Sequence, residues 1–527
     1  MTNGIDEFMG CDVIFIIGSN TTENHPVIGA KIRQAIRRGT KLIVADPRKI
    51  DLARNSEIFL QIKPGTNVAL LNVMMHVMLK ENLHNKEFID SRTENFEKLE
   101  EVVRGFTPEK AAEICGVKAE DIEAAARLYA KAEKGSIVYC MGITQHTTGV
   151  NNVMNIANLA MLCGQIGRES TGVNPLRGQN NVQGACDMGA LPGTYTGYQS
   201  VIKQEVADKF KEAWGVEVLS TKSGLTVSEM IHAAECGEIK MLYIMGENPM
   251  VSDPDLNHVK HALENTEFLV VQDIFLTETA QLADVVLPAA AFAEKDGTFT
   301  NTERRVQRVR KAISAPGEAK ADWEIIMELM NKLGYETKYM NPSEIFNEMA
   351  ALTPSYAGID YQRLEKTGIQ WPCPNKEHPG SPYLHKDSFV RGKGVFMGIE
   401  YKESAELPDE KYPLTLTTGR ILYHYHTRTM TGRVEGLNKK SPESFVQINP
   451  VTAIKLKIRD EDMVKVSSRR GSILVKAKVS DIVEQDVVFI PFHFAAGAAN
   501  VLTNSALDPN SKTPELKVCA VVVEKLG

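Results

Sequence analysis

Short apolar runs that end in glycine or in a polar turn recur along the chain. The first, Val13–Ile17, ends at Gly18, and a helix with apolar positions on one face is predicted over 27–38. A second run, Lys41–Ala45, ends at Asp46. Strands buried on both faces of a sheet read as continuous apolar runs. This part of the sequence therefore predicts a βαβ unit with polar residues at its strand ends.

The same pattern returns in the middle of the chain. Met241–Met245 ends at Gly246, a helical stretch lies around 259–263, and the apolar run 267–271 leads to Asp273. Each unit has Gly-x-Asn after its first strand, which predicts a duplicated nucleotide site. Backbone N–H groups at a helix start can bind a pyrophosphate, and a carboxylate at the next strand end can accept from ribose or guanine donors. Gly-x-Asn is not the NAD fingerprint. The sequence therefore leaves an alternative open, in which the two segments are ordinary α/β units whose glycines only make tight turns.

A polar loop at 172–189 follows an apolar helix predicted over 150–163. It contains four glycines, five amides and one arginine. So many polar groups beside a core are costly unless they are hydrogen-bonded, which makes the loop a candidate site. Arg177 could bind a carboxylate with both arms of its guanidinium. The alternative is a surface loop in which Arg177 pairs with Asp187. A further polar turn, 141–146, follows the strand predicted over 136–140. It contains His146, and a histidine in a hydrogen-bonded turn is more often structural than catalytic.

Short strands prevail from residue 412 onward. Val475, Ala477 and Val479 alternate with lysines, the two-residue period of a half-buried strand. Further apolar runs predict a β-rich domain, and barrel closure is one way to arrange them; they lie at 414–417, 445–448, 464–467, 487–490 and 518–523.

Composition narrows the function classes. The chain has 527 residues with 60 Lys+Arg and 67 Asp+Glu, a net charge of −7, which argues against nucleic acid or an anionic membrane as the main partner. No apolar run reaches the ~20 residues of a membrane span. The eight cysteines form no C-x-x-C pair, so the usual signatures of zinc ribbons and iron–sulfur clusters are absent from the sequence.

Together these motifs resemble the large catalytic subunit of molybdopterin-dependent formate dehydrogenases, from residue 1 to 527. The most specific element is the segment Leu-Arg-Gly-Gln-Asn-Asn-Val-Gln-Gly-Ala-Cys-Asp-Met-Gly at 176–189. Supporting motifs lie at 18–20, 46–48, 63–65, 142–146, 246–249 and around Gly419. The resemblance implies an α/β fold with two Rossmann-like units related by pseudosymmetry and a C-terminal six-stranded β-barrel. The domains expected are 1–179, 180–292, a connecting segment 293–402, and 403–527.

The resemblance also implies a cofactor, a bis-molybdopterin guanine dinucleotide with Mo or W. One nucleotide would be bound by Gly18, Asn20, Glu23, Asp46 and Gly65. The other would be bound by Gly246, Glu247, Asn248 and Asp273. The cradle would be completed by Gly142, Gln145, Arg420, His426, Asn500 and Lys517. Further cofactor-binding candidates are Ser19, Arg48, Gln272 and Gly419. One departure is Asn67, where relatives often have Asp, which leaves the role of that position open.

The activity implied by the resemblance is oxidation of formate to CO2. Arg177 matches the arginine that anchors formate, and Gln179 matches a polar group beside it. Two electrons would pass to an iron–sulfur chain in electron-transfer subunits or to a ferredoxin-like acceptor. The alternatives are another molybdopterin oxidoreductase, such as a nitrate reductase, and a non-catalytic scaffold subunit of a respiratory complex.

Several parts of the family pattern cannot be placed in this sequence. The family begins with a cysteine motif for a four-iron four-sulfur cluster, then a lysine on the electron path, then a selenocysteine or cysteine metal ligand followed by histidine. Our hypothesis is that the chain is the C-terminal portion of a longer enzyme, cut where a selenocysteine codon was read as a stop, with the ligand upstream of Met1. Alone it is expected to be inactive. A cytoplasmic location is expected, with an upstream export signal left open.

Overall fold

A five-stranded parallel sheet forms the core of the N-terminal part. The computed structural model describes residues 1–526. The strand order is β3-β2-β1-β5-β6. The strands are β1 (Val13–Ile17), β2 (Lys41–Ala45), β3 (Ile58–Leu60), β5 (Gly135–Tyr139) and β6 (Gly172–Pro175). All five residues of the central strand β1 are buried, as its continuous apolar run predicts.

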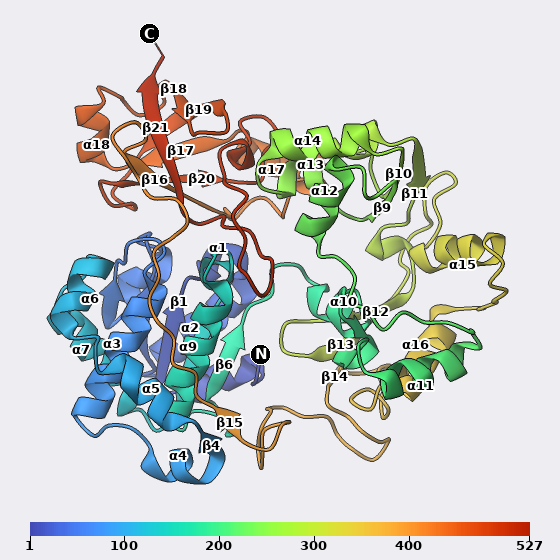
Figure 1. The fold of residues 1–527 in the computed structure, drawn as a ribbon, viewed down its shortest axis with the longest axis horizontal. Helices are drawn as coiled ribbons and strands as arrows, with labels where there is room; N and C mark the ends of the chain where they lie inside the picture. Colours follow the sequence, from blue (N-terminus) through green and yellow to red (C-terminus); the bar gives the residue numbers. More distant parts are fainter. Residues whose placement is uncertain (527) are drawn as a thin grey trace. The chain divides into compact units, whose positions relative to one another are not determined.

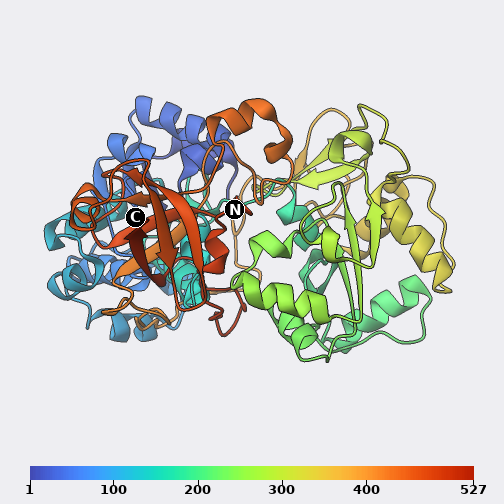
Figure 2. The ribbon, with the colours of Figure 1, turned by 90° about the horizontal axis from the view of Figure 1, so that it is seen from above.

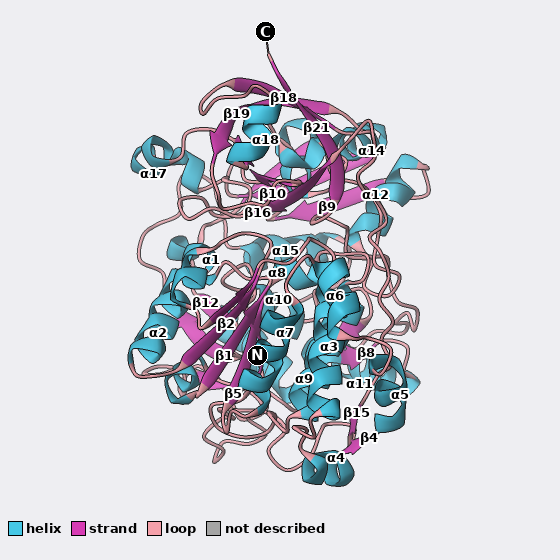
Figure 3. Cartoon of the chain, turned by 90° about the vertical axis from the view of Figure 1, so that its left-hand side faces the viewer, coloured by secondary structure: helices cyan, strands magenta, loops and turns pink. Residues whose placement is uncertain are grey.

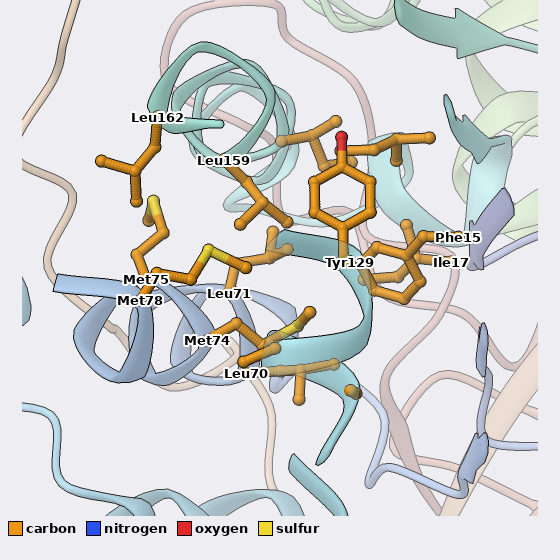
Figure 4. Close-up of a cluster of buried hydrophobic side chains, with 14 of the residues drawn as sticks. Phe15, Ile17, Leu70, Leu71, Met74, Met75, Met78, Tyr129, Leu159 and Leu162 are labelled. Carbon is orange, nitrogen blue, oxygen red and sulfur yellow. The ribbon is translucent and has the colours of Figure 1, made fainter. Parts of the chain in front are cut away.

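Helices cover both faces of this sheet (Figure 3). Successive side chains of a strand point to opposite faces. Ile14 and Ile16 therefore pack in the cluster that contains α2 (Pro26–Arg37). Phe15 and Ile17 pack on the other face, in the cluster shown in Figure 4, against the helices α3 (Asn67–Lys80), α7 (Ala119–Ala130) and α9 (Gly149–Leu162). The predicted doubly covered sheet is confirmed.

A row of buried asparagines joins α3 and α9 to a later segment of the chain. Asn155 Nδ2 donates to Asn72 Oδ1 at 2.7 Å, and Asn158 Nδ2 donates to Asn155 Oδ1 at 3.1 Å. Asn72 and Asn158 also donate to the carbonyls of Ile399 and Met397, each at 2.8 Å. These bonds satisfy amides that would be costly to bury alone, and they fasten the segment that leads to the barrel. The other elements here are α1 (Thr21–Asn24), α4 (Lys86–Arg92), β4 (Thr93–Glu94), α5 (Phe96–Val103), α6 (Pro108–Cys115), α8 (Met141–Thr144) and β15 (Gly394–Val395).

The C-terminal part is a closed six-stranded barrel in the order β16-β20-β17-β19-β18-β21, seen from above in Figure 2. Its strands are β16 (Leu414–Gly419), β17 (Phe445–Ile448), β18 (Met463–Ser467), β19 (Ser472–Val479), β20 (Val487–Pro491) and β21 (Cys519–Lys525). Two helices, α17 (Glu435–Lys440) and α18 (Pro450–Lys455), interrupt them. Val475 and Ala477 point into the barrel core, as their alternation with lysines predicts. The predicted barrel is confirmed.

The middle of the chain has a second, smaller parallel sheet, ordered β11-β10-β9 (Figure 1). Its strands are β9 (Met241–Met245), β10 (Phe268–Asp273) and β11 (Val285–Pro288). An antiparallel sheet follows, formed by β12 (Gly297–Thr300), β13 (Arg305–Val309) and β14 (Ile369–Gln370). The remaining elements are α10 (Val182–Asp187), β7 (Thr194–Tyr195), β8 (Gln199–Ser200), α11 (Gln204–Trp214), α12 (Val227–Glu235), α13 (Pro249–Ser252), α14 (Leu256–Asn265), α15 (Asp322–Lys332) and α16 (Pro342–Leu352).

Contacts divide the chain into two compact units. The first comprises residues 1–176, 249–259 and 383–527, and the second comprises 177–248 and 260–382. The α/β fold class with two parallel-sheet units and a C-terminal barrel is confirmed. The division into four domains stays a prediction. Among residues 1–526, no helix combines the length and the apolar character that crossing a membrane requires.

Candidate functional site

The two predicted glycine turns share one backbone geometry. Gly18 follows β1, has φ +58°, and donates its N–H to the Ala45 carbonyl at 3.0 Å. Gly246 follows β9, has φ +65°, and donates its N–H to the Gln272 carbonyl at 2.9 Å. In each unit the acceptor is at the end of the adjacent parallel strand. Positive φ favours glycine at both turns, so the sequence repeat corresponds to a structural repeat.

The first unit contains a pocket at the carboxyl ends of β1, β2 and β5, and barrel residues form its other wall. The pocket is open to solvent, and the space between its walls together with that open solvent is about 740 Å³. Predicted site residues that line it are Gly18, Asn20, Asp46, Arg48, Gly65, Gly142, Gly419, Arg420 and Lys517. Lining residues outside that prediction include Asn24, Lys63, His146 and Phe489. The carboxyl edge of a parallel sheet is where α/β proteins bind ligands.

Two glycine backbones meet at the floor of the pocket. The N–H of Gly142 donates to the Gly18 carbonyl at 3.1 Å. A Cβ on Gly142 would lie 2.6 Å from the Gly18 oxygen, and a Cβ on Gly18 would lie 2.7 Å from the Gly142 carbonyl carbon. Both separations are shorter than any ordinary contact, so neither position has room for a side chain. The turns after β1 and β5 can approach this closely only as glycines.

A buried contact between a histidine and a glutamate fastens the Gly142 turn. His146 Nε2 lies 3.0 Å from the Gly142 carbonyl, and its Nδ1 lies 3.1 Å from Glu515 Oε1. Glu515 Oε2 also accepts the backbone N–H of Thr147 at 2.9 Å. Burial alone would raise the pKa of Glu515, but His146 and Thr147 outweigh it and hold that pKa below its usual value. His146 therefore positions the turn, in agreement with the structural role that the sequence favours.

The pocket combines buried cations with one buried carboxyl. Arg48, Arg420 and Lys517 are all buried. The Arg48 guanidinium lies 3.6 Å from the centre of the Phe489 ring and donates to Gln447 Oε1 at 3.1 Å. Burial lowers the pKa of Lys517 to about 8 and raises the pKa of Asp46 to about 6. Desolvated cations in excess over carboxylates favour an anionic ligand such as a pyrophosphate.

Several buried polar atoms near this pocket find no hydrogen-bond partner within residues 1–526. They are Glu23 Oε2 and Asn24 Oδ1 at the end of α1, and Arg48 Nε. Buried polar groups are normally paired, so these atoms have hydrogen-bonding capacity that a bound group could use. The oxygens accept, as the N–H groups of guanine and the hydroxyls of ribose require, whereas Arg48 Nε donates, as a phosphate requires. This combination of acceptors and one donor fits a guanine nucleotide.

Five predicted residues of the first unit stand outside the pocket lining: Ser19, Glu23, Gln145, His426 and Asn500. Three of them make contacts that brace the surrounding loops. Asn500 Nδ2 donates to the carbonyls of Val251 and Ser252 at 3.0 and 2.9 Å. The His426 carbonyl accepts from His493 Nδ1 at 2.5 Å. The Gln145 carbonyl accepts the N–H of Leu516 at 3.2 Å.

The second unit holds the residues predicted for the second nucleotide. Asn248 is buried, donates to Glu278 Oε2 at 2.7 Å and accepts from Thr279 Oγ1 at 2.7 Å. Gln272 Nε2 donates to Asp322 Oδ1 at 2.7 Å, and Asp273 Oδ1 accepts the N–H of Ile274 at 2.6 Å. Glu247 is half-buried beside Gly246. These polar residues gather at the carboxyl edge of β9 and β10.

The second unit also holds Arg177 and Gln179, both half-buried in the loop before α10. Arg177 Nε donates to Gln183 Oε1 at 3.2 Å, and Nη1 lies 3.8 Å from Cys186 Sγ. Direct pairing of Arg177 with Asp187, the alternative from the sequence, is not what the structure has. Gln183 stands between them, because its Nε2 donates to Asp187 Oδ1 at 2.8 Å.

Comparisons with known proteins agree with these features. The family model for molybdopterin oxidoreductase matches residues 1–332, and the model described as "Molydopterin dinucleotide binding domain" matches residues 414–520, the barrel. The "F420-dependent formate dehydrogenase subunit alpha" of Methanocaldococcus jannaschii is 57% identical over all of this chain and 78% of its own length. The "Formate dehydrogenase H" of Escherichia coli is 42% identical over all of this chain and 74% of its own length.

A solved structure shares the fold. Acetylene hydratase from Pelobacter acetylenicus superposes with a TM-score of 0.80 over all of this chain and 81% of that one, at 21% identity. The family models cover most of the chain, and the formate dehydrogenase relatives align along its whole length. The chain belongs to the molybdopterin oxidoreductase family, among the formate dehydrogenase alpha subunits.

Proposed function

We propose that this chain is the formate-oxidising subunit of a formate dehydrogenase. The carrying observation is the segment 176–189, which includes α10 and in which Arg177 is held through Nε and Nη1. Within residues 1–526 its Nη2 group makes no hydrogen bond to protein. A guanidinium held in this way can offer N–H groups to a planar carboxylate. Relatives at 57% and 42% identity that are named formate dehydrogenases support the choice of substrate.

The proposed cofactor is a bis-molybdopterin guanine dinucleotide with Mo or W. When bound, it accepts the hydrogen and electrons that formate loses. Arg48, Arg420 and Lys517 would neutralise the pyrophosphate of one nucleotide, while Asp46 and the unpaired oxygens of Glu23 and Asn24 would accept from its guanine and ribose. The turn at Gly246, with Glu247, Asn248, Gln272 and Asp273, would hold the other nucleotide. Support comes from the orphaned buried atoms and from the repeated turn geometry.

Arg177 would act on formate through charge. Formate is an anion, and its oxidation, HCOO⁻ to CO2 with one proton and two electrons, yields a neutral product. A guanidinium therefore attracts the substrate and loses that attraction once CO2 forms, which helps release. Gln179, two residues away on the same half-buried loop, would contribute a further polar contact.

The remaining assignments are proposals of the same kind. Electrons would leave through an iron–sulfur chain to partner subunits or to a ferredoxin-like acceptor, and the enzyme would work in the cytoplasm. The selenocysteine or cysteine ligand and the four-iron four-sulfur cluster remain predictions from the resemblance. The four predicted domains would correspond to the two nucleotide units, a connecting segment and the barrel.

The test compares substrates on the complete enzyme, purified with its partner subunits. Formate oxidation with a viologen dye should proceed, and nitrate reduction should not. Acid treatment should release two guanine nucleotides per Mo or W. Nitrate reduction without formate oxidation would favour a nitrate reductase instead. If neither metal nor guanine nucleotide is found, the result would favour the non-catalytic scaffold subunit instead. Replacing Arg177 by Ala should raise the KM for formate at least tenfold without loss of cofactor.

A further inference from the structure

A fully buried carboxylate lies behind Arg177, and the proposed chemistry gives it no task. Asp187 is at the end of α10, with none of its surface exposed. Its Oδ1 accepts from Gln183 Nε2 at 2.8 Å, and its Oδ2 accepts from Trp371 Nε1 at 2.8 Å and from the Tyr356 hydroxyl. A buried charge with this many donors is a satisfied and therefore rigid group.

The hydrogen bonds of this network can form with only one assignment of donors and acceptors. A carboxylate can only accept, and a guanidinium can only donate. Gln183 lies between the two, so its amide must turn its nitrogen to Asp187 and its oxygen to Arg177. The Gln183 nitrogen also faces the Tyr198 hydroxyl at 2.8 Å. Asp187 thus determines which end of the amide faces Arg177 Nε, 3.2 Å away.

The Trp371 side of Asp187, opposite Gln183, is also fixed by hydrogen bonds. Trp371, which donates to Asp187, has its own carbonyl bound by the buried guanidinium of Arg304. Arg304 also donates to the Ser381 carbonyl at 3.1 Å. Because both sides of the carboxylate are anchored, a change at Asp187 is transmitted to Gln183 and not absorbed by movement of the tryptophan loop.

We propose that Asp187 is a positioning residue for Arg177. Through the Gln183 amide it fixes Arg177 Nε, and it thereby directs Nη2 towards the substrate carboxylate. The network itself stands on the contacts above, and its effect on formate rests on the proposed function. Gln183 and Asp187 are four residues apart on α10, so they share one helix face and act as a unit.

The decisive experiment exchanges the two polar groups. Asp187→Asn alone puts an amide N–H against either Gln183 Nε2 or the Trp371 indole, and both of those are donors. Gln183→Glu alone sets two carboxylates against each other. The double variant Gln183→Glu with Asp187→Asn restores every donor–acceptor pair and the total charge. In the complete enzyme each single variant should raise the KM for formate at least tenfold, with the KM for the dye unchanged, and the double variant should return to within threefold of wild type.

The chain offers a matched control. Gln204 Nε2 donates to Asp208 Oδ1 at 2.9 Å with the same spacing on α11, but this pair is exposed and, within residues 1–526, shares no hydrogen bond with Arg177, Gln183 or Asp187. The corresponding single variants Gln204→Glu and Asp208→Asn should leave the KM for formate unchanged. Metal and guanine contents, measured for every variant, should equal wild type. Unchanged formate KM in folded Asp187→Asn enzyme, or a double variant no better than the singles, would overturn the proposal.

A second measurement does not depend on activity. If Asp187 acts on Arg177 through Gln183, the Tm losses of Asp187→Asn and Arg177→Met should not add, because either change breaks the same chain of bonds. Additive losses would contradict the network whatever the substrate is. If the wild-type enzyme leaves formate untouched while the Tm losses are non-additive, the proposed function fails and the positioning of Arg177 stands.

Discussion

Replacing Gly142 by Ala tests how tightly the pocket floor is built. The added Cβ would lie 2.6 Å from the Gly18 oxygen and 2.7 Å from the Gly18 Cα. This is about 0.7 Å inside ordinary contact, so one of the two turns has to move. Neither moves easily, because β1 and β5 are paired in the same sheet and His146 clamps the second turn.

The magnitude follows from these contacts. Overpacking at a rigid position costs about 1–3 kcal/mol, and the Gly142–Gly18 hydrogen bond contributes about 1 kcal/mol more if it breaks. The first unit should therefore lose about 2–4 kcal/mol of unfolding free energy. Since both turns line the pocket, the variant should also retain less guanine nucleotide.

The assay pairs chemical denaturation of the ligand-free chain with guanine nucleotide released by acid from the loaded enzyme. Gly436→Ala is the control, because a Cβ there meets nothing within 4 Å and the residue lies in α17. That change should be neutral or gain about 0.5–1 kcal/mol from helix propensity. If Gly142→Ala is as stable as this control and keeps its full nucleotide, the close approach of the two turns does not exist in solution.

Three further predictions concern the pocket and the core. Arg48→Met should lower the amount of retained guanine nucleotide about tenfold, because a charged hydrogen bond to a phosphate is worth about 1.5–3 kcal/mol. Arg33→Met, which removes an exposed ion pair, should leave that amount unchanged. The measurement is the guanine nucleotide content of the two variants. Burial raises the pKa of Asp46 to about 6, so ligand-free stability falls as pH rises from its unfolded value near 4 through 6. Asp46→Asn should therefore stabilise the ligand-free chain by about 3 kcal/mol at pH ~7.5 and by nothing at pH ~3.5, measured by denaturant titration, and a gain equal at both pH values would contradict this. Leu71→Ala in the cluster of Figure 4 should lower the unfolding free energy by about 2–5 kcal/mol. Val27→Ala, at a side chain that is 71% exposed, should lower it by less than about 0.5 kcal/mol. Equal losses in denaturation would refute the assigned packing.

Much of the architecture could be predicted because periodicity is local. The run 13–17 predicted a strand buried on both faces, and the alternation around Val475 predicted a half-buried strand, which the structure places in the barrel wall. The repeat of Gly18 and Gly246 predicted two turns of one geometry. Helix bounds differed by about a residue, as with 150–163 against Gly149–Leu162, because end residues depend on capping and not on apolar spacing.

The candidate site was less predictable where partners come from distant segments. Nothing near His146 in the sequence indicates Glu515, which lies in the segment leading into β21. Asn248 was predicted to contact a nucleotide, but its bonds to Glu278 and Thr279 depend on how the chain folds back after β10. The i, i+4 spacing of Gln183 and Asp187 could have been read as one helix face. Residue types alone left a direct Arg177–Asp187 pair open as an alternative, and the structure has Gln183 between the two.

The order in which the pocket residues occur along the chain has a consequence for biosynthesis. Its wall begins at Gly18 and is complete only at Lys517, and the intervening second unit is encoded before the barrel. A ribosome working from the N-terminus therefore makes the parallel sheet long before the cations of the barrel exist to face it. Until Lys517 has emerged, the nascent sheet lacks a barrel cation that the proposed dinucleotide site would need. If the pocket binds the proposed dinucleotide, cofactor insertion is a late maturation step, and a stalled chain ending before the barrel should carry no guanine nucleotide.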